Sequence, residues 1–346
     1  MFSTQRSHPD AEALATLCTE LSARAEGTRS QGPWRSGAFD LLARSGALAG
    51  FIPADCGGTA AEEAAITTVL VAIAERCLTT ALALTQWASA CRIIAGGTDA
   101  VRQSLLPPLA RGETRTTVGI SQLSTSRRHL GAAALTAARD GDGWRLSGLC
   151  PWVTGADSSD TIVTGALTAL GQQLFFVVPR TAPGLSIAPP LDLMALSGSR
   201  TSIVTFADVS PLHVIEPDTT GGIRTGGLAT SALALGSTHA ALALLDQDAE
   251  ARPALAPVAA GLREEAVAIA ARLHEPAGEQ SARDRLRADA NSLVVRAAQA
   301  ALTAAKGAGF VVGHPAERLV RESMFFLVWS CPQTVSNAVL CELAGV

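Results

Sequence analysis

The spacing of hydrophobic residues changes twice along this chain. Towards both ends, apolar residues recur at helical intervals, as Leu14, Leu17 and Leu21 do near the start. Between residues 116 and 217, short β-branched runs are instead bounded by Gly, Pro and Asp, which is typical of strands. The pattern predicts an α+β fold with an N-terminal helical domain at 1–115, a middle β domain at 116–222 and a C-terminal helical bundle at 223–346.

The predicted helices are rich in small apolar residues. Residues 60–91 are nearly continuous in alanine and leucine, and we expect Gly96-Gly97 to end that helix. Thr98 is expected to cap a short helix over 99–106, which Pro107-Pro108 would terminate. Further helices, the later ones giving a C-terminal four-helix-bundle domain, are predicted over residues 10–26, 228–252, 257–274, 282–308, 317–329 and 334–343.

The middle domain is predicted to be an antiparallel β-barrel or sandwich. Its expected strands lie at residues 116–121, 133–139, 144–149, 161–164, 174–178 and 202–206. No alternation of strands and helices is visible, and no glycine-rich dinucleotide loop follows a strand. These two observations exclude a Rossmann-type nucleotide-binding domain.

Composition narrows the class of protein. Hydrophobic residues make up 48% of the 346 residues and charged residues only 17%, so we expect part of the surface to be covered by another subunit. The net charge of −4 gives no basic footprint for nucleic acid. Seven scattered cysteines, without a histidine cluster, predict neither disulfides nor a metal site and indicate a reducing cytoplasm.

No membrane segment is expected. The start of the chain lacks an apolar signal core. The longest uncharged runs, 161–179 and 225–245, are interpreted as a hairpin and a buried helix.

A tryptophan and a threonine stand together near the end of a predicted hairpin. The turn Asp140-Gly-Asp-Gly143 supplies the glycines that a tight hairpin needs, and the returning strand delivers Trp152 and Thr154. A flat aromatic beside a small hydroxyl suits a ring system that takes one stacked face and one hydrogen bond. The alternative is a core tryptophan beside an ordinary strand threonine.

The surrounding motifs resemble those of the acyl-CoA dehydrogenase family. Gly119-Ile-Ser-Gln-Leu-Ser124 resembles its Thr-Glu-Pro-type motif, Trp152-Val-Thr154 its Trp-Ile-Thr motif, and Phe206-Ala-Asp-Val-Ser-Pro211 its strand ending in Asp-Val-x-Pro. Pro53-Ala-Asp-Cys-Gly-Gly58 and Lys306-Gly-Ala-Gly-Phe310 resemble two further segments of the family. The resemblance covers most of the chain, and the five pieces occur in the family's order.

This resemblance implies a three-domain flavoprotein that binds FAD. Ser121 falls where the family has a hydroxyl that hydrogen-bonds the flavin, and Gln122 replaces the usual Glu. Trp152 falls where an aromatic covers the ring, and Thr154 where a hydroxyl meets its N5 edge. The alternative is a vestigial site that keeps only the shape of the fold.

The family's catalytic carboxylate is absent. In the family, this base takes the α-proton of an acyl thioester while the β-hydrogen leaves as hydride to flavin N5. Counted from Arg321, the base position is Ser330, and an unactivated serine hydroxyl is no base. Carboxylates on an earlier helix are weak alternatives, namely Asp246, Asp248 and Glu250. Glu322 matches a structural Asp of the family.

Cationic residues mark two further departures. Arg252 and Arg263 stand near the place where the family has an Arg-x-x-Phe-Gly segment for the neighbouring subunit's pyrophosphate, and they are either substitutes or surface residues. Arg127-Arg128 replaces Ser-Asp beside the acyl-CoA entrance, so this pair either meets an anionic substrate or forms a basic surface loop. His129, His239 and His314 are interpreted as packed or solvated residues, and Cys331 has no evident partner base.

Three functions remain open at this point. The first is an FAD-dependent oxidoreductase that carries out α,β-oxidation of an acyl-CoA or similar thioester. The second is a flavin-dependent monooxygenase on the same scaffold, and the third is a catalytically degenerate subunit that works with a homologous partner. The resemblance also implies a homodimer or homotetramer.

Overall fold

The computed structural model describes most of the chain. The described residues are 9–25, 32–35, 37–124, 134–216, 228–275, 279–329, 335–337 and 340–341. The chain divides into two compact units, and the division falls inside one helix. Unit 1 holds residues 1–62, 82–193 and 197–225, and unit 2 holds 63–81, 194–196 and 226–346. The three predicted domains stay a prediction, because these units group the chain differently.

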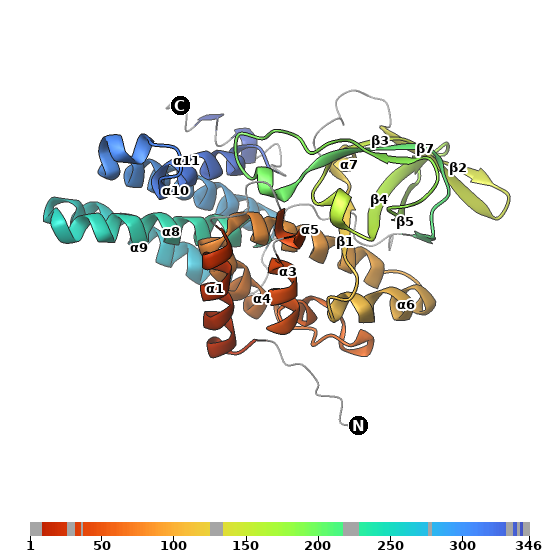
Figure 1. The fold of residues 1–346 in the computed structure, drawn as a ribbon, viewed down its shortest axis with the longest axis horizontal. Helices are drawn as coiled ribbons and strands as arrows, with labels where there is room; N and C mark the ends of the chain where they lie inside the picture. The colour runs from red at the N-terminus through yellow and green to blue at the C-terminus, as the bar shows by residue number, and fades with distance from the viewer. Residues whose placement is uncertain are drawn as a thin grey trace. The chain divides into compact units, whose positions relative to one another are not determined.

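Helices, then strands, then helices follow one another as predicted, which confirms the fold class (Figure 1). The first helices are α1 (Ala11–Ala25), α2 (Gly32–Arg35), α3 (Ala38–Arg44), α4 (Glu63–Arg76), α5 (Leu78–Ala95) and α6 (Asp99–Ala110). The middle elements are β1 (Thr116–Gly119), α7 (Ser121–Ser124), β2 (Leu135–Asp140), β3 (Gly143–Val153), β4 (Thr161–Thr168), β5 (Gln173–Pro179), β6 (Leu185–Ile187), β7 (Ser202–Val209) and β8 (His213–Ile215). The last helices are α8 (Leu228–Ala251), α9 (Ala256–Leu273), α10 (Gln280–Ala305) and α11 (Pro315–Ser323).

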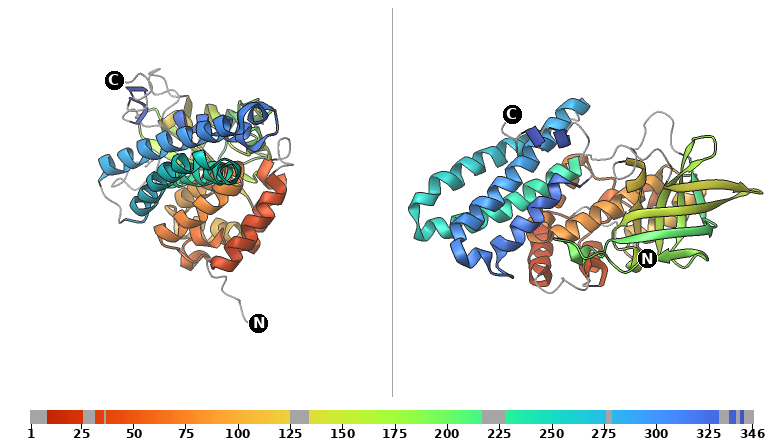
Figure 2. Two further views of the ribbon diagram at one scale, coloured as in Figure 1. Left: turned by 90° about the vertical axis from the view of Figure 1, so that its left-hand side faces the viewer. Right: turned by 90° about the horizontal axis from the view of Figure 1, so that it is seen from above.

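The strands form one mixed sheet rather than a purely antiparallel one. Their order is β6-β7-β3-β2-β4-β5-β8, and β1 pairs with β4 off this path. Most pairings are antiparallel, but β1 and β2 both run parallel to β4. Figure 2 shows these strands, in yellow and green, gathered into one body.

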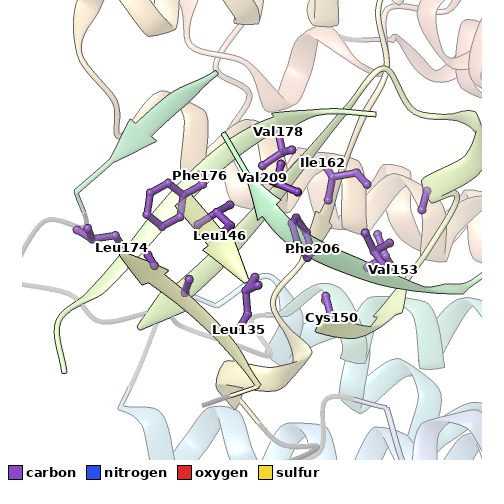
Figure 3. Packing of buried hydrophobic residues seen from close by; sticks show 14 residues of the cluster. Leu135, Leu146, Cys150, Val153, Ile162, Leu174, Phe176, Val178, Phe206 and Val209 are labelled. Atoms are coloured by element: carbon purple, nitrogen blue, oxygen red, sulfur yellow. The ribbon is translucent and has the colours of Figure 1, made fainter. Parts of the chain in front are cut away.

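The sheet packs around an apolar core. Residues that alternate along β3, β4 and β5 point to the same side and are almost completely buried, as Figure 3 shows for Leu146, Cys150, Ile162 and Phe176. Burying such side chains contributes roughly 1.5–3 kcal/mol each. The interior is therefore the rigid support for whatever the strand ends carry.

Two of the predicted helix boundaries are wrong. The helix predicted over 60–91 is two helices, because the chain leaves helical geometry at Cys77 between α4 and α5. Pro107 and Pro108 lie inside α6 instead of ending it. Both prolines lack an N–H to donate, but their carbonyls accept later backbone bonds, from Arg111 at 3.3 Å and Glu113 at 2.9 Å. The Thr98 cap is confirmed, since its Oγ1 accepts from the N–H of Val101 at 3.5 Å.

Unit 2 is built around α8. This helix packs against α4, α9 and α10, which run beside it as long helices in Figure 2. At Gly236, an added Cβ would lie 2.3 Å from the carbonyl oxygen of Val71 on α4, so the two backbones approach closely. By length and composition α8 could cross a membrane, but 72% of its most apolar window is buried within the structure.

The end of the chain is less helical than predicted. α11 ends at Ser323, and a short 3₁₀ segment, Met324–Leu327, follows it where a helix to residue 329 was expected. Of the helix predicted over 334–343, residues 335–337 and 340–341 are described and helical.

Candidate functional site

A bulge turns Trp152 out of the sheet. Along β3, Cys150 pairs with Val204 and Val153 with Ser202, so one extra residue is accommodated between these two pairs. The bulge breaks the alternation: Cys150 and Val153 are buried, whereas Trp152 is 47% exposed. Bulges of this kind re-aim side chains next to binding sites. The indole is thus presented to solvent from a rigid strand.

A row of hydroxyl groups lies directly beside this bulge. Thr154 Oγ1 is 3.2 Å from Thr201 Oγ1, which is 2.8 Å from Ser199 Oγ. Thr117 Oγ1 donates to the carbonyl of Thr154 at 2.8 Å. All four residues are buried, with Thr154 and Thr201 each 6% exposed. We call Ser199, Thr201 and Thr154 the hydroxyl row.

The chain after Thr154 is held by an aromatic pair. Gly155 has a φ of 62°, and a Cβ there would lie 2.4 Å from the ring of Trp34. Trp34 in turn stacks on Phe39 with ring centroids 4.5 Å apart. Gly155 also donates its N–H to the carbonyl of Ser199 at 3.0 Å. Only glycine fits here without strain, so this contact fixes the position of the hydroxyl row.

An ion pair closes the same corner of unit 1. Arg200 Nε donates to Asp157 Oδ2 at 2.8 Å, and both side chains are about one-fifth exposed. Arg200 has a φ of 51°, which a non-glycine residue rarely adopts. The ion pair holds this backbone between Ser199 and Thr201 in place.

Gln122 does not face outward with Trp152. Its side chain is 7% exposed and donates through Nε2 to the carbonyl of Gly165 at 2.9 Å. Its Oε1 accepts from the thiol of Cys150 at 3.1 Å. Gln122 therefore forms its hydrogen bonds inside the β domain. As a direct flavin contact it stays a prediction without a geometric basis, whereas Ser121 beside it is partly exposed.

Cys150 is the residue that sequence reasoning missed. Burial raises the pKa of its thiol to about 12, and hydrogen bonds from Trp152 and Ser121 offset only part of that effect. The thiol is thus in contact with Ser121, Gln122 and Trp152 together. Residues two apart in a regular strand share a face, so the sequence alone places Cys150 on the same side as Trp152, and the bulge that separates them is not visible in it.

Several predicted residues lie outside the described part of the chain. These are the base position Ser330, the cationic pair Arg127 and Arg128, and also His129 and Cys331. Their roles stay predictions from the resemblance.

The alternative bases on α8 are surface residues. Asp246 is paired with Arg263 at 2.6 Å, and both side chains are about half exposed. Asp248 is paired with Arg252 at 2.9 Å, and Glu250 is exposed. Two of these carboxylates are therefore engaged in ion pairs at the surface, and the third is exposed. The same pairs occupy Arg252 and Arg263, the suggested phosphate contacts.

Two histidines have structural partners. His314 Nδ1 accepts from the N–H of Ala316 at 3.1 Å and caps α11. His239 Nδ1 lies 3.9 Å from Glu75, so the carboxylate that the sequence did not reveal comes from α4. Burial lowers the pKa of His239, and Glu75 offsets part of that shift.

Glu322 on α11 is the carboxyl group with the most altered environment among the described residues. Burial raises its pKa to about 7, although Arg318 and Arg321 act in the opposite direction. A carboxyl group with such a pKa is suited to accept and release a proton near neutral pH. Its chemistry therefore differs from that of the exposed carboxylates on α8.

The described residues contain no cluster of histidine, cysteine or acidic side chains that could hold a metal ion. Two surface hollows are lined by residues of α1 and α3 and by residues of α9 and α10, and Trp152 lines neither of them.

The corner around Trp152 offers a stacking face and hydroxyl groups, the features that a flat ring such as a flavin needs. An indole that is 47% exposed offers a stacking face, and the hydroxyl row ends next to it. Ser121, whose Oγ is buried, is linked to Trp152 through hydrogen bonds with the thiol of Cys150. Ser121, Trp152 and Thr154 would hold such a ring, with Thr201 behind Thr154.

Comparisons with known proteins show which proteins this chain is similar to. Residues 11–113 match the family described as "Acyl-CoA dehydrogenase, N-terminal domain". The chain is similar to the probable acyl-CoA dehydrogenase YngJ of Bacillus subtilis, with 26% identity over 238 residues, 64% of this chain and 62% of that protein. The chain thus spans less than two thirds of that relative's length.

Two solved structures share the fold over almost the whole chain. The glutaryl-coenzyme A dehydrogenase complex with glutaryl-CoA matches with a TM-score of 0.80 and 19% identity, over 98% of this chain and 97% of that one. KijD3 in complex with FMN and a dTDP-linked amino-keto sugar matches with a TM-score of 0.73 and 22% identity, over 100% and 97%. At these identities the two structures show the fold alone.

Proposed function

Because this chain belongs to the acyl-CoA dehydrogenase family of flavoprotein oxidoreductases, we propose that it binds FAD and oxidises an acyl thioester. The carrying observation is the corner at the end of β3, where an exposed indole stands next to the hydroxyl row. FAD, when bound, would supply the electron acceptor for the two-electron oxidation of the thioester.

The residues of the chain would position the ring and its substrate. Trp152 provides an aromatic face on a rigid strand, and Thr154 provides a hydroxyl that Thr201 holds at 3.2 Å. Ser121 provides a second polar contact from α7. The cationic pair Arg127 and Arg128 is proposed to meet the phosphates of an acyl-CoA.

The proton acceptor is the open part of this proposal. Ser330 has no carboxylate, and Asp246 and Glu250 are exposed. Glu322 belongs to unit 2 and Trp152 to unit 1, so the raised pKa of Glu322 alone does not assign it a role at the corner around Trp152.

A flavin-dependent monooxygenase is the second candidate. The missing carboxylate at residue 330 favours it, because oxygen chemistry does not need an α-proton acceptor at that position. KijD3, a neighbour in fold, was solved with FMN and a sugar nucleotide rather than with an acyl-CoA. A degenerate subunit that functions with a homologous partner is the third candidate.

The deciding experiment is an absorbance spectrum of the purified chain, followed by anaerobic titration with acyl-CoAs of different length. Bleaching of bound FAD by a thioester supports the dehydrogenase. If no thioester bleaches the bound FAD, but the reduced flavin and oxygen convert an organic substrate to a hydroxylated product, the result supports the monooxygenase instead. A colourless chain that takes up FAD only when co-expressed with a homologue would leave the degenerate subunit.

Matched variants locate the site. Thr154→Val should weaken FAD binding, whereas Thr205→Val, on an exposed position of β7 in the same unit, should not. Equal behaviour of the two variants would place the flavin elsewhere.

A further inference from the structure

The Gln122 side chain is completely used by neighbouring strands. Its Nε2 donates to the carbonyl of Gly165 at 2.9 Å and lies 3.4 Å from Thr164 Oγ1, both on β4. A carbonyl can only accept, so the amide nitrogen must face Gly165 and the amide oxygen must face Cys150. The glutamine thus links β4 to β3 through the interior of the sheet.

This link is what holds α7 in place. A helix of four residues has no stability of its own, so tertiary contacts must fix it. Besides the Gln122 bonds, Leu123 packs on Gly165 so closely that a Cβ there would lie 2.4 Å from Leu123 Cδ1. Ser121 belongs to the same turn and therefore moves with Gln122.

The thiol of Cys150 completes the link. It donates to Gln122 Oε1 at 3.1 Å and also takes part in hydrogen bonds with Ser121 and with the backbone of Trp152. Since burial raises the pKa of Cys150 to about 12, the thiol stays protonated and remains a donor at neutral pH. It is therefore a structural donor and no nucleophile.

We propose that Gln122 and Cys150 form an internal brace that positions Ser121 and Trp152 at the flavin site. The role of the brace rests on the proposed function, because it would position residues around a flavin. Its geometry does not depend on that function. Gln122 is then a positioning residue that acts through Ser121, and Cys150 acts through both neighbours.

The brace explains why a glutamate is unsuitable at residue 122. A carboxylate there would face the carbonyl oxygen of Gly165 with no proton between them. Among the described groups that face the Gln122 amide, Cys150 is the titratable one, and it is neutral. A Gln122→Glu side chain must therefore take up a proton to fit, and its pKa will rise.

The first test is FAD binding by purified variants of the full chain. We expect Gln122→Leu and Cys150→Ala each to raise the Kd for FAD at least tenfold and to shift the spectrum of the remaining bound flavin. Cys150→Ser keeps a donor and should stay within threefold of the wild type. The double variant should bind FAD no more weakly than the single variants do, because each single substitution already removes the same brace. Gln172→Leu, at an exposed glutamine of the same unit, is the matched control.

The pH dependence separates positioning from a general loss of structure. Gln122→Glu should bind FAD within threefold of the wild type at pH 5.5 and at least tenfold more weakly at pH 8, while the wild type changes little. Thermal midpoints measured alongside should show that each variant is folded at the assay temperature. FAD binding unchanged in folded Gln122→Leu, or pH-independent in Gln122→Glu, would overturn the proposal.

Hydrogen exchange tests the brace without any flavin. In Gln122→Leu, the amides of α7 should exchange at least tenfold faster, while those of β5 should keep their wild-type rates. If the wild type binds no FAD, the proposed function fails, and faster exchange in α7 still supports the brace. Unchanged exchange in α7 would overturn the brace as well.

Discussion

The hydroxyl row is held together by the hydroxyl groups of single side chains. Thr201→Val keeps the shape of the side chain but removes the hydroxyl that contacts both Thr154 and Ser199. We expect the free energy of unfolding to fall by about 1–2 kcal/mol, because two buried hydroxyls lose a partner. The Kd for FAD should rise roughly tenfold, since a loss of about 1.4 kcal/mol corresponds to that factor. Urea unfolding and absorbance titration measure the two effects.

The control for this change is Thr205→Val, an exposed threonine on β7, the strand that begins directly after Thr201. It should leave both quantities unchanged. An equal loss in the two variants would mean that the effect comes from β7 in general and not from the hydroxyl row.

Glu322 makes stability depend on pH. Its pKa rises from an ordinary 4.5 to about 7 in the folded chain, so the folded chain binds a proton where the unfolded chain has released it. Stability should therefore fall as the pH rises from about 4.5 to about 7, by about 3 kcal/mol at most. Glu322→Gln should remove this slope and be the more stable protein at pH 8, which urea unfolding across this pH range will show.

A matched change at Glu264, an exposed carboxyl on α9, should keep the wild-type slope. If Glu322→Gln also keeps it, then Glu322 is ionised in the folded chain throughout this range.

The family resemblance pointed to Trp152, Thr154 and Ser121 as flavin contacts, which stay predictions, but it did not point to the residues that support them. Thr201 is 47 residues from Thr154, and Cys150 is 28 residues from Gln122. Such pairs are brought together by strand register, which a single sequence does not reveal. For the same reason, Gln122 was assigned to the flavin although its amide is directed into the sheet.

At the scale of elements, the close approach of α8 and α4 is the most sensitive contact. Gly236→Ala would place a Cβ 2.3 Å from the carbonyl oxygen of Val71 and 2.7 Å from the Cβ of Ala74. We expect a loss of at least about 2 kcal/mol in the free energy of unfolding, although alanine is the better helix former by about 1 kcal/mol. Thermal or urea unfolding measures it.

Gly261 on α9 provides the opposite case. A Cβ there meets nothing within 4 Å, so Gly261→Ala should stabilise the chain by up to about 1 kcal/mol. The two glycines look alike in the sequence. Similar stabilities of the two alanine variants would show that α8 and α4 can move apart without cost.

Helical and strand segments were predictable because their periodicity is local. The ends of α8, α9 and α10 agree with the prediction to within about three residues, which is the usual precision of such boundaries. The break at Cys77 was not predictable, because no glycine or proline marks it. Pro107 and Pro108 misled the prediction, since proline is tolerated where the helix continues through its carbonyl groups.

At the scale of the whole molecule, a bound flavin should stabilise the fold. A ligand that binds only the folded chain at 100 times its Kd adds about 2.7 kcal/mol to the free energy of unfolding. With FAD added, we expect a higher thermal midpoint and slower hydrogen exchange in β3 and β7, which carry Trp152 and the approach to the hydroxyl row. Exchange in α9, which carries no predicted contact, should stay the same. Slower exchange in α9 alone would place FAD elsewhere.

The outward turn of Trp152 also gives the protein an optical signal of its own. The chain contains five tryptophans and no tyrosine, so its ultraviolet emission comes from indole alone. Trp34 and Trp87 are 3% and 0% exposed, whereas Trp152 is 47% exposed. A quencher dissolved in water should therefore quench the fluorescence of Trp152 well before that of Trp34 and Trp87. A flavin stacked on Trp152 should likewise quench the fluorescence of this residue first. The residue that would hold the cofactor would then report its arrival, without any added dye.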